Sequence, residues 1–436
     1  MNRIRAVHGR QVFDSRGRPT VEVEVTLDSG LVARASVPSG ASTGSNEAHE
    51  LRDGDERFFN GLGVLSAVEH ANGEIAAALR GRDVSDQAGC DALLRDLDGT
   101  PGLSRLGANA VLGTSLAICR ASARTAGQPL FRRIAELAGV ADAALPMPMV
   151  NILSGGLHAG RGMDVQDFLV IPVGATSMLE ALQYAARLRD AAAAVCAERG
   201  IPTLLADEGG LSPACRTGRE ALDLMMTAAE RARLVPGDDV AIAIDVAATA
   251  LFDRETGTYH LRREGRRVDT GEMIDVIASW VDDFPILSIE DPLDEEDWDG
   301  WRAITRRLGG RAHLIGDDLF TTNLGRLRRG IETDCATGVL VKVNQNGTLT
   351  GTLEVVSTAR AAHFVPVVSA RSGETEDDLL ADLAVGTAAG QIKVGSLRSS
   401  ERLAKYNQLL RIAEDPGIAF SAYPEPSQWS VEGLSA

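Results

Sequence analysis

The sequence predicts an α/β protein of two domains, an N-terminal α+β domain at residues 1–140 and a closed (β/α) barrel at residues 141–436. The first observation is a repeated pattern, in which a short apolar run of strand character ends in a charged residue. Three such runs end in carboxylates, at Val240–Asp245, Phe284–Pro292 and His313–Asp318. Three later runs end in a basic residue, at Lys342, Arg371 and Lys393.

The second observation is the spacing of these charges. The intervals between Glu290, Asp317, Lys342, Arg371 and Lys393 are 27, 25, 29 and 22 residues. An interval of this size holds one strand and one returning helix, which is the repeating unit of a parallel barrel. Ordinary solvated loop residues would account for two or three such charges. Six charges, each at the end of a successive predicted strand, are hard to explain that way. Because barrels carry their chemistry at the carboxyl ends of the strands, we expect one shared site there.

Composition narrows the class of protein. The chain has 436 residues, of which 44% are hydrophobic, so it has the material for two domains with a large core. Its 44 basic and 61 acidic residues give a net charge of −17. This charge argues against a nucleic-acid surface and is compatible with the binding of metal cations.

Cysteine usage and hydropathy indicate the compartment. The five cysteines form no Cys-x-x-Cys pair, which favours a reducing environment over a disulfide framework. The N-terminus has no apolar signal core, and no segment runs for about 18 apolar residues without a charge. We therefore expect a soluble cytoplasmic protein that does not bind membranes.

The N-terminal domain begins with β structure and continues with helices. Residues 4–37 alternate between apolar and polar, with a hairpin turn at 28–30. Residues 38–44 form a loop of small and hydroxyl side chains, which is either a plain connection or a mobile contact for an oxyanion or metal. Residues 63–139 have a helical pattern, and a boundary is expected near residues 142–148.

The second domain opens with strands at 150–153 and 166–172 around a glycine-dense loop at 154–162. This loop lacks the strand–loop–helix context of a dinucleotide site. A long helix is predicted over 177–200, followed by an acidic pair beside two glycines at 207–210 that alone would be only a turn. A helix is predicted over 402–410, before a polar C-terminal end.

Taken together, these motifs resemble the enolase family over almost the whole chain, from Asp14-Ser15-Arg16-Gly17 to Glu401-Arg402-Leu403-Ala404-Lys405. The stretches that carry the resemblance are 38–44, 106–110, 207–210, 288–292, 342–345 and 371–377. The resemblance implies an N-terminal α+β domain before an enolase-type (β/α)8 barrel whose first two strands are antiparallel. It also implies a glycolytic lyase that dehydrates 2-phosphoglycerate to phosphoenolpyruvate with two Mg²⁺ ions per site, in cytoplasmic homodimers or larger oligomers.

The resemblance also implies roles for individual residues. The metal ligands would be Asp245, Glu290, Asp317 and Ser42. Lys342 would be the base and Glu208 the acid. The substrate would be held by His158, Gln166, Asp167, Arg371, Ser372 and Lys393.

The chemistry explains these residue types. Proton removal next to a carboxylate creates extra negative charge that must be stabilised where it forms. Carboxylate oxygens are suitable ligands for the Mg²⁺ ions that supply this stabilisation. A lysine base must be neutral near pH 7, which nearby cations favour. An arginine and a serine provide directed hydrogen bonds to a phosphate.

Two pocket positions depart from the family pattern. Asp167 stands where the family has Glu, which withdraws the carboxylate by about an ångström, and a shift of that size can cost about a hundredfold in rate. Ala370 stands where the family has His, and the lost hydrogen bond is worth about 1 to 3 kcal/mol if its partner stays buried. Three functions remain open: an enolase acting on 2-phosphoglycerate, an enolase-like enzyme that joins phosphoglycerate to a phosphonoformate-type partner in phosphonate or phosphinate biosynthesis, or a non-catalytic binding or structural protein.

Overall fold

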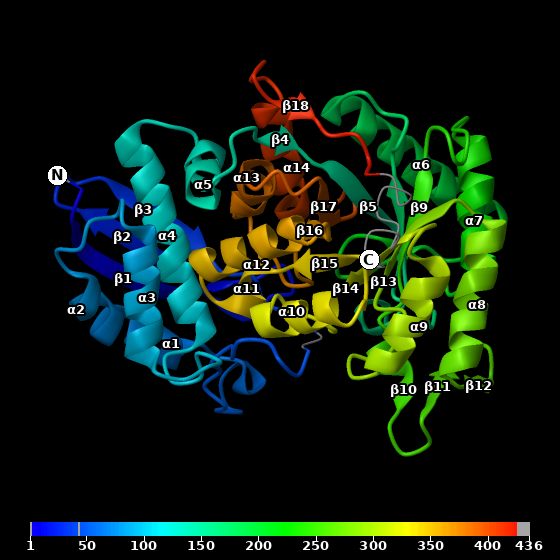
Figure 1. Cartoon of the computed structure of the whole chain (residues 1–436), viewed down its shortest axis with the longest axis horizontal. Coiled ribbons are helices and arrows are strands. Elements are labelled where there is room, and N and C mark those ends of the chain that lie inside the picture. The colour runs from blue at the N-terminus through cyan, green and yellow to red at the C-terminus, as the bar shows by residue number, and fades with distance from the viewer. Residues whose placement is uncertain (1, 42–43, 425–436) are drawn as a thin grey trace.

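The computed structural model describes residues 2–41 and 44–424, except for the side chain of His158. The N-terminal sheet and its helices, blue to cyan in Figure 1, lie at one end of the long axis. The barrel and its helices occupy the remainder, which confirms the predicted α/β architecture.

The N-terminal domain packs helices on one antiparallel sheet. The sheet has the order β1-β2-β3, with β1 at Ile4–Phe13, β2 at Pro19–Leu27 and β3 at Val32–Ser36. Alternate residues of β2, such as Val21, Val23 and Val25, are fully buried beneath helix α4 (Ala108–Ala126). The other helical elements are η1 (Phe59–Gly61), α1 (Leu65–His70), η2 (Ala71–Ile75), α2 (Ala76–Leu79), α3 (Gln87–Asp98) and α5 (Leu130–Ala138).

Eight strands close the barrel. They are β5 (Met147–Ser154), β6 (Asp167–Ile171), β9 (Ala241–Asp245), β13 (Ile286–Glu290), β14 (His313–Gly316), β15 (Gly338–Val341), β16 (Val365–Ser369) and β17 (Gln391–Gly395). β17 pairs with β5, so the sheet has no open edge at that point. β6 runs antiparallel to both β5 and β9, whereas the other barrel pairs are parallel, as expected for this family.

Helices surround the barrel strands. They are α6 (Met178–Glu198), α7 (Gly218–Arg231), α8 (Thr270–Asp283), α9 (Trp298–Leu308), α10 (Leu324–Glu332), α11 (Val343–Asn346), α12 (Leu349–Ala361), α13 (Leu379–Gly386) and α14 (Ser400–Ile412). Several begin at side-chain caps, for example Ser177 on α6, and α8 has a capping box of Asp269 with Glu272.

The two-residue period of the strands determines which charges enter the barrel. A small inner core includes Ala243 of β9, Ile315 of β14 and Leu340 of β15. Two residues further along lie Asp245, Asp317 and Lys342, which therefore point to the same inner side. In the same way, Val367 of β16 precedes Ser369 and Arg371. The inner face is thus apolar inside the barrel and charged at its carboxyl rim.

Other elements interrupt the strand–helix repeat. A three-stranded antiparallel sheet of β10 (Phe252–Asp253), β11 (Thr258–Leu261) and β12 (Arg266–Val268) lies between β9 and α8, and the sequence analysis did not predict it. The remaining short elements are β4 (Ala144–Leu145), η3 (Leu157–Ala159), β7 (Leu204–Leu205), β8 (Leu211–Ser212), η4 (Ala248–Leu251) and β18 (Ala419–Phe420).

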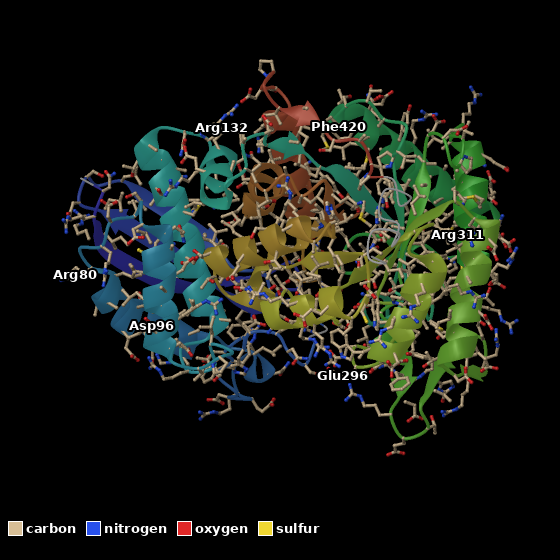
Figure 2. All side chains as sticks on the ribbon, viewed as in Figure 1. Arg80, Asp96, Arg132, Glu296, Arg311 and Phe420 are labelled. Carbon is tan, nitrogen blue, oxygen red and sulfur yellow. The ribbon has the colours of Figure 1, made fainter. Side chains whose placement is uncertain are left out.

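Charged side chains cover the outer surface. Figure 2 shows Arg80 and Asp96 on the N-terminal domain and Arg311 on the barrel domain, and all three are exposed. Among the helices of the described ranges, none combines the length and apolar character needed to span a bilayer.

Candidate active site

The centre of the site is a buried cluster of two carboxylates and an ammonium group. Asp245 and Glu290 are neighbours in the register of β9 and β13. The Nζ of Lys393, on β17, donates to Asp245 Oδ2 at 2.8 Å and to Glu290 Oε2 at 2.7 Å. Gln166 Nε2 donates to the same Asp245 oxygen at 3.0 Å. Barrel closure therefore joins four predicted site residues from four parts of the chain.

A second ion pair lies beside the first. Lys342 Nζ donates to Asp317 Oδ2, and Gln345 Nε2 donates to Asp317 Oδ1 at 3.0 Å. Thr322 Oγ1 orients Gln345 by donating to its Oε1 at 2.6 Å. Asp317 is thus held from both oxygens at the position where β14 ends.

Burial and charge shift the pKa values of these groups in opposite directions. Burial raises the pKa of Glu290 well above its ordinary value, and the neighbouring Asp245 raises it further. Burial would also raise the pKa of Asp245, but the Lys393 ion pair outweighs it and the pKa is lowered. For Lys342, burial favours the neutral amine, yet the ion pair with Asp317 outweighs burial and raises the pKa. A base role for Lys342 therefore requires Asp317 to give up this ion pair.

The predicted phosphate-binding residues occupy the rim next to the N-terminal domain. Arg371 Nη1 donates to Glu47 Oε2 at 3.0 Å and to Asn344 Oδ1 at 2.8 Å. Ser372 Oγ accepts from the backbone N–H of Ala41 at 2.8 Å and from Arg16 Nη1 at 3.2 Å. The guanidinium group and the hydroxyl group are thus positioned by residues from both domains.

The side chain of Asp167, at the start of β6, contacts residues of the paired strand β5. Its Oδ1 accepts from Asn151 Nδ2 at 2.6 Å and from Ser154 Oγ at 2.8 Å. Its Oδ2 is buried and has no hydrogen-bond partner among the described residues. Burial and the nearby Glu208 raise the pKa of Asp167 well above its ordinary value. The Asp167 carboxylate is therefore anchored through Oδ1, and Oδ2 can accept a ligand or a proton.

Glu208 lies on a short loop fixed by backbone contacts. The Ser396 N–H donates to the Glu208 carbonyl at 2.9 Å, and Arg189 Nη2 donates to the Gly209 carbonyl at 3.2 Å. A Cβ on Gly210 would lie 2.3 Å from Ser154 Oγ, so only glycine allows the loop to approach the Asp167 anchor this closely. The buried Glu208 side chain thus lies near Asp167, although the two are separated in sequence.

The donor set is suitable for a hard cation. Asp291, Asp317 and Asp318 each offer a carboxylate oxygen, and these oxygens lie within 4.8 Å of one another. Both oxygens of Asp291 already accept N–H groups, from Asp317 at 2.9 Å and Asp318 at 2.7 Å. Asp245 and Glu290, the other predicted ligands, instead share the Lys393 ammonium. Anionic oxygen ligands are those that Mg²⁺ prefers, and the two ammonium groups show that the rim accommodates positive charge.

Two of the predicted site side chains lie outside the described part of the chain, and two residues that contact the site were not predicted. Ser42 lies outside the described residues, as does the side chain of His158. Glu47 and Gln345 were not predicted, although each contacts a predicted site residue. Gln345 lies in the 342–345 stretch that carries the resemblance, and this was the available signal. Ala370 is buried where the family has His, so it contributes no polar group at the rim.

Comparison with protein families is consistent with this geometry. The family model described as "Enolase, N-terminal domain" matches residues 4–134. The family model described as "Enolase, C-terminal TIM barrel domain" matches residues 142–423. The two matches cover almost the whole chain and divide it between the N-terminal sheet with its helices and the barrel.

Proposed function

The chain belongs to the enolase family of lyases, and from this premise we propose that it removes the α-proton of 2-phosphoglycerate and eliminates water to give phosphoenolpyruvate, with Mg²⁺. The observation that carries the proposal is the buried cluster in which Lys393 contacts Asp245 and Glu290 while Lys342 contacts Asp317. Perturbed pKa values in such a cluster are typical of catalytic sites.

The proposed roles follow from position and charge. Lys342 takes the α-proton after Asp317 is released from its ion pair, and Glu208 protonates the leaving hydroxyl group. Lys393 holds the substrate carboxylate, while Arg371 and Ser372 hold the phosphate. Mg²⁺ bound by Asp245, Glu290 and Asp317 would stabilise the negative charge that develops on the carboxylate.

A second candidate function is favoured by the two altered pocket positions. Ala370 presents a methyl group, and Asp167 is drawn back by Asn151 and Ser154. Both side chains are smaller than those of the family pattern, and from this difference in size we infer more room near the leaving group. An enolase-like reaction that joins phosphoglycerate to a phosphonoformate-type partner would make use of that space.

We also propose a homodimer in the cytoplasm. Phe13, Phe58 and Phe59 are 59%, 63% and 44% exposed, and the rings of Phe13 and Phe59 lie 5.7 Å apart. Exposed aromatic side chains gathered in this way are typical of an interface between subunits. The five cysteines are free thiols, which suits a reducing compartment.

The test is turnover of 2-phosphoglycerate by the purified protein, followed by the ultraviolet absorbance of phosphoenolpyruvate. We expect turnover with Mg²⁺, loss of turnover on chelation, and recovery when Mg²⁺ is restored. Turnover that ignores chelation would contradict the metal assignment. Absence of turnover with Mg²⁺, combined with turnover when phosphonoformate is added, would favour the second candidate.

A further inference from the structure

A single glutamine amide connects the two sides of the candidate active site. Gln345 lies in α11, directly after β15, and is 3% exposed. Its Nε2 donates to Asp317 Oδ1 at 3.0 Å and to Glu47 Oε1 at 3.3 Å. Asp317 is a predicted metal ligand, whereas Glu47 contacts the predicted phosphate-binding residue Arg371. The two hydrogens of one amide group thus bridge a carboxylate on the metal side and a carboxylate on the phosphate side.

The Glu47 carboxylate extends this contact to Arg371. Its Oε2 accepts from Arg371 Nη1 at 3.0 Å, and its Oε1 accepts from Arg371 Nη2 at 3.2 Å. The side chain of Glu47 is 8% exposed and that of Arg371 is 2% exposed. A carboxylate that accepts from both terminal nitrogens fixes the plane of a guanidinium group. The orientation of Arg371 therefore depends on the position of Glu47, and so on Gln345.

Thr322 sets the orientation of the Gln345 amide. Its Oγ1 donates to Gln345 Oε1 at 2.6 Å and accepts the backbone N–H of Lys342 at 2.9 Å. Because Gln345 Oε1 accepts this hydrogen bond, the Nε2 end of the amide is the end that faces the two carboxylates. Thr322 thus acts on both sides of the site through Gln345.

The backbone that presents the Thr322 hydroxyl group is strained. Thr321 and Thr322 lie in the turn between β14 and α10, are fully buried, and have φ values of 47° and 49°. β-branched residues rarely adopt this left-handed conformation, and such strain is concentrated at functional sites. The strain is a second observation, independent of the hydrogen bonds, that indicates a functional role for this turn.

We propose that Gln345, oriented by Thr322, is a positioning residue that holds Asp317 and the Glu47–Arg371 pair in one arrangement. The affinity for Mg²⁺ and the affinity for phosphate then depend on the same amide group. The inference rests on the proposed function, because that function assigns Asp317 to the metal and Arg371 to the phosphate. It deepens that function by adding two residues that act through Asp317 and Glu47.

The test is calorimetric titration of the purified full-length protein with Mg²⁺, and with inorganic phosphate when Mg²⁺ is saturating. Gln345→Met keeps the length of the side chain and removes the amide group. We expect both affinities to weaken about tenfold or more, because hydrogen bonds to a ligating carboxylate change metal affinity by about 10- to 100-fold. The matched control is Gln87→Met. Gln87 is also buried and donates to a carboxylate, that of Asp91 at 3.1 Å, but neither residue is a predicted site residue. We expect Gln87→Met to bind both probes as the wild type does.

Two variants of Thr322 separate positioning from a general loss of structure. Thr322→Val removes the hydroxyl group and keeps the shape of the side chain, and we expect it to weaken phosphate binding in the same direction as Gln345→Met. Thr322→Ser retains the hydroxyl group, and we expect affinities close to those of the wild type. Combining Thr322→Val with Gln345→Met should weaken phosphate binding no further than Gln345→Met alone, because Thr322 acts through Gln345.

Several outcomes would overturn the proposal. They are absence of Mg²⁺ or phosphate binding by the wild type, unchanged affinities in Gln345→Met, equal weakening in Gln87→Met, additive effects in the double variant, and equal weakening in Thr322→Ser and Thr322→Val. If Gln345→Met does not fold, the comparison of Thr322→Val with Thr322→Ser decides by itself. Failure of the wild type to turn over 2-phosphoglycerate would instead refute the proposed function, while the two titrations would still report on Gln345.

Discussion

Lys393→Met tests whether a metal cation can bind where the Lys393 ammonium group contacts Asp245 and Glu290. Lys393 is 5% exposed and contacts two carboxylates, at 2.8 Å and 2.7 Å. Methionine retains most of the apolar length of the side chain and removes only the charge. Asp245 and Glu290 then face each other without a cation between them.

The magnitude follows from the burial of the cluster. Removing one partner of a buried ion pair costs about 3 to 5 kcal/mol, because the other charge stays buried and uncompensated. The raised pKa of Glu290 lets this carboxyl group take up a proton, so we expect the lower end of that range. A bound cation would restore the compensation, and binding at 100 times its Kd adds about 2.7 kcal/mol to the free energy of unfolding.

The assay is urea-induced unfolding of wild type and variant, with chelator and with Mg²⁺. We expect Lys393→Met to be destabilised in chelator, and Mg²⁺ to stabilise it more than it stabilises the wild type. The matched control is Lys405→Met. Lys405 is 1% exposed and pairs at 2.9 Å with Glu374, which is not one of the predicted metal ligands. We expect Lys405→Met to lose a similar amount of stability. We expect Mg²⁺ to stabilise this variant no more than it stabilises the wild type.

The reasoning would be refuted if Mg²⁺ raised the free energy of unfolding equally in Lys393→Met and Lys405→Met. It would mean that the Asp245–Glu290 pair has no particular affinity for a cation. The assignment of these two residues as metal ligands would then lose its physical basis.

Three further predictions concern the catalytic roles, the altered pocket and a buried histidine. Lys342→Ala is expected to abolish exchange of the substrate α-proton with deuterated solvent, whereas Glu208→Gln blocks net turnover and leaves some exchange, because the two side chains serve separate half-steps. Equal exchange in both variants by proton NMR would void that assignment. Ala370→His with Asp167→Glu is expected to raise kcat/KM for 2-phosphoglycerate about tenfold, equivalent to about 1.4 kcal/mol; a slower double variant would indicate a pocket shaped for a larger partner. Burial lowers the pKa of His313 from 6.5 to about 4, so the unfolded chain binds the proton more tightly. The contribution of the neutral His313 side chain to the free energy of unfolding is complete above pH 6.5 and is lost as the pH falls toward 4, by about 1.4 kcal/mol per pH unit. Urea unfolding of His313→Gln should lack this part of the pH dependence. An unchanged pH profile in the variant would contradict the prediction.

Local patterns carried most of the fold prediction. The β2 alternation, the long helix after Ser177 and the strand-end charges were all readable because each depends on neighbours in the sequence. The β10–β12 sheet was missed, since its strands are short and its charged residues give no clear two-residue period. Strand ends were predicted to within a few residues, but β5 begins at Met147, earlier than expected.

The sequence by itself determined that acidic and basic residues stand at the ends of successive strands, because the two-residue period and the strand–helix spacing are properties of the local chain. Only the tertiary structure decided which charges meet. Lys393 contacts Asp245 and Glu290 across 148 and 103 residues of sequence, and Arg371 contacts Glu47 across 324. The anchoring of Asp167 by Asn151 and Ser154 is likewise visible only once β5 and β6 are paired. Contacts of this kind depend on barrel closure and on the packing of side chains, which no local pattern encodes.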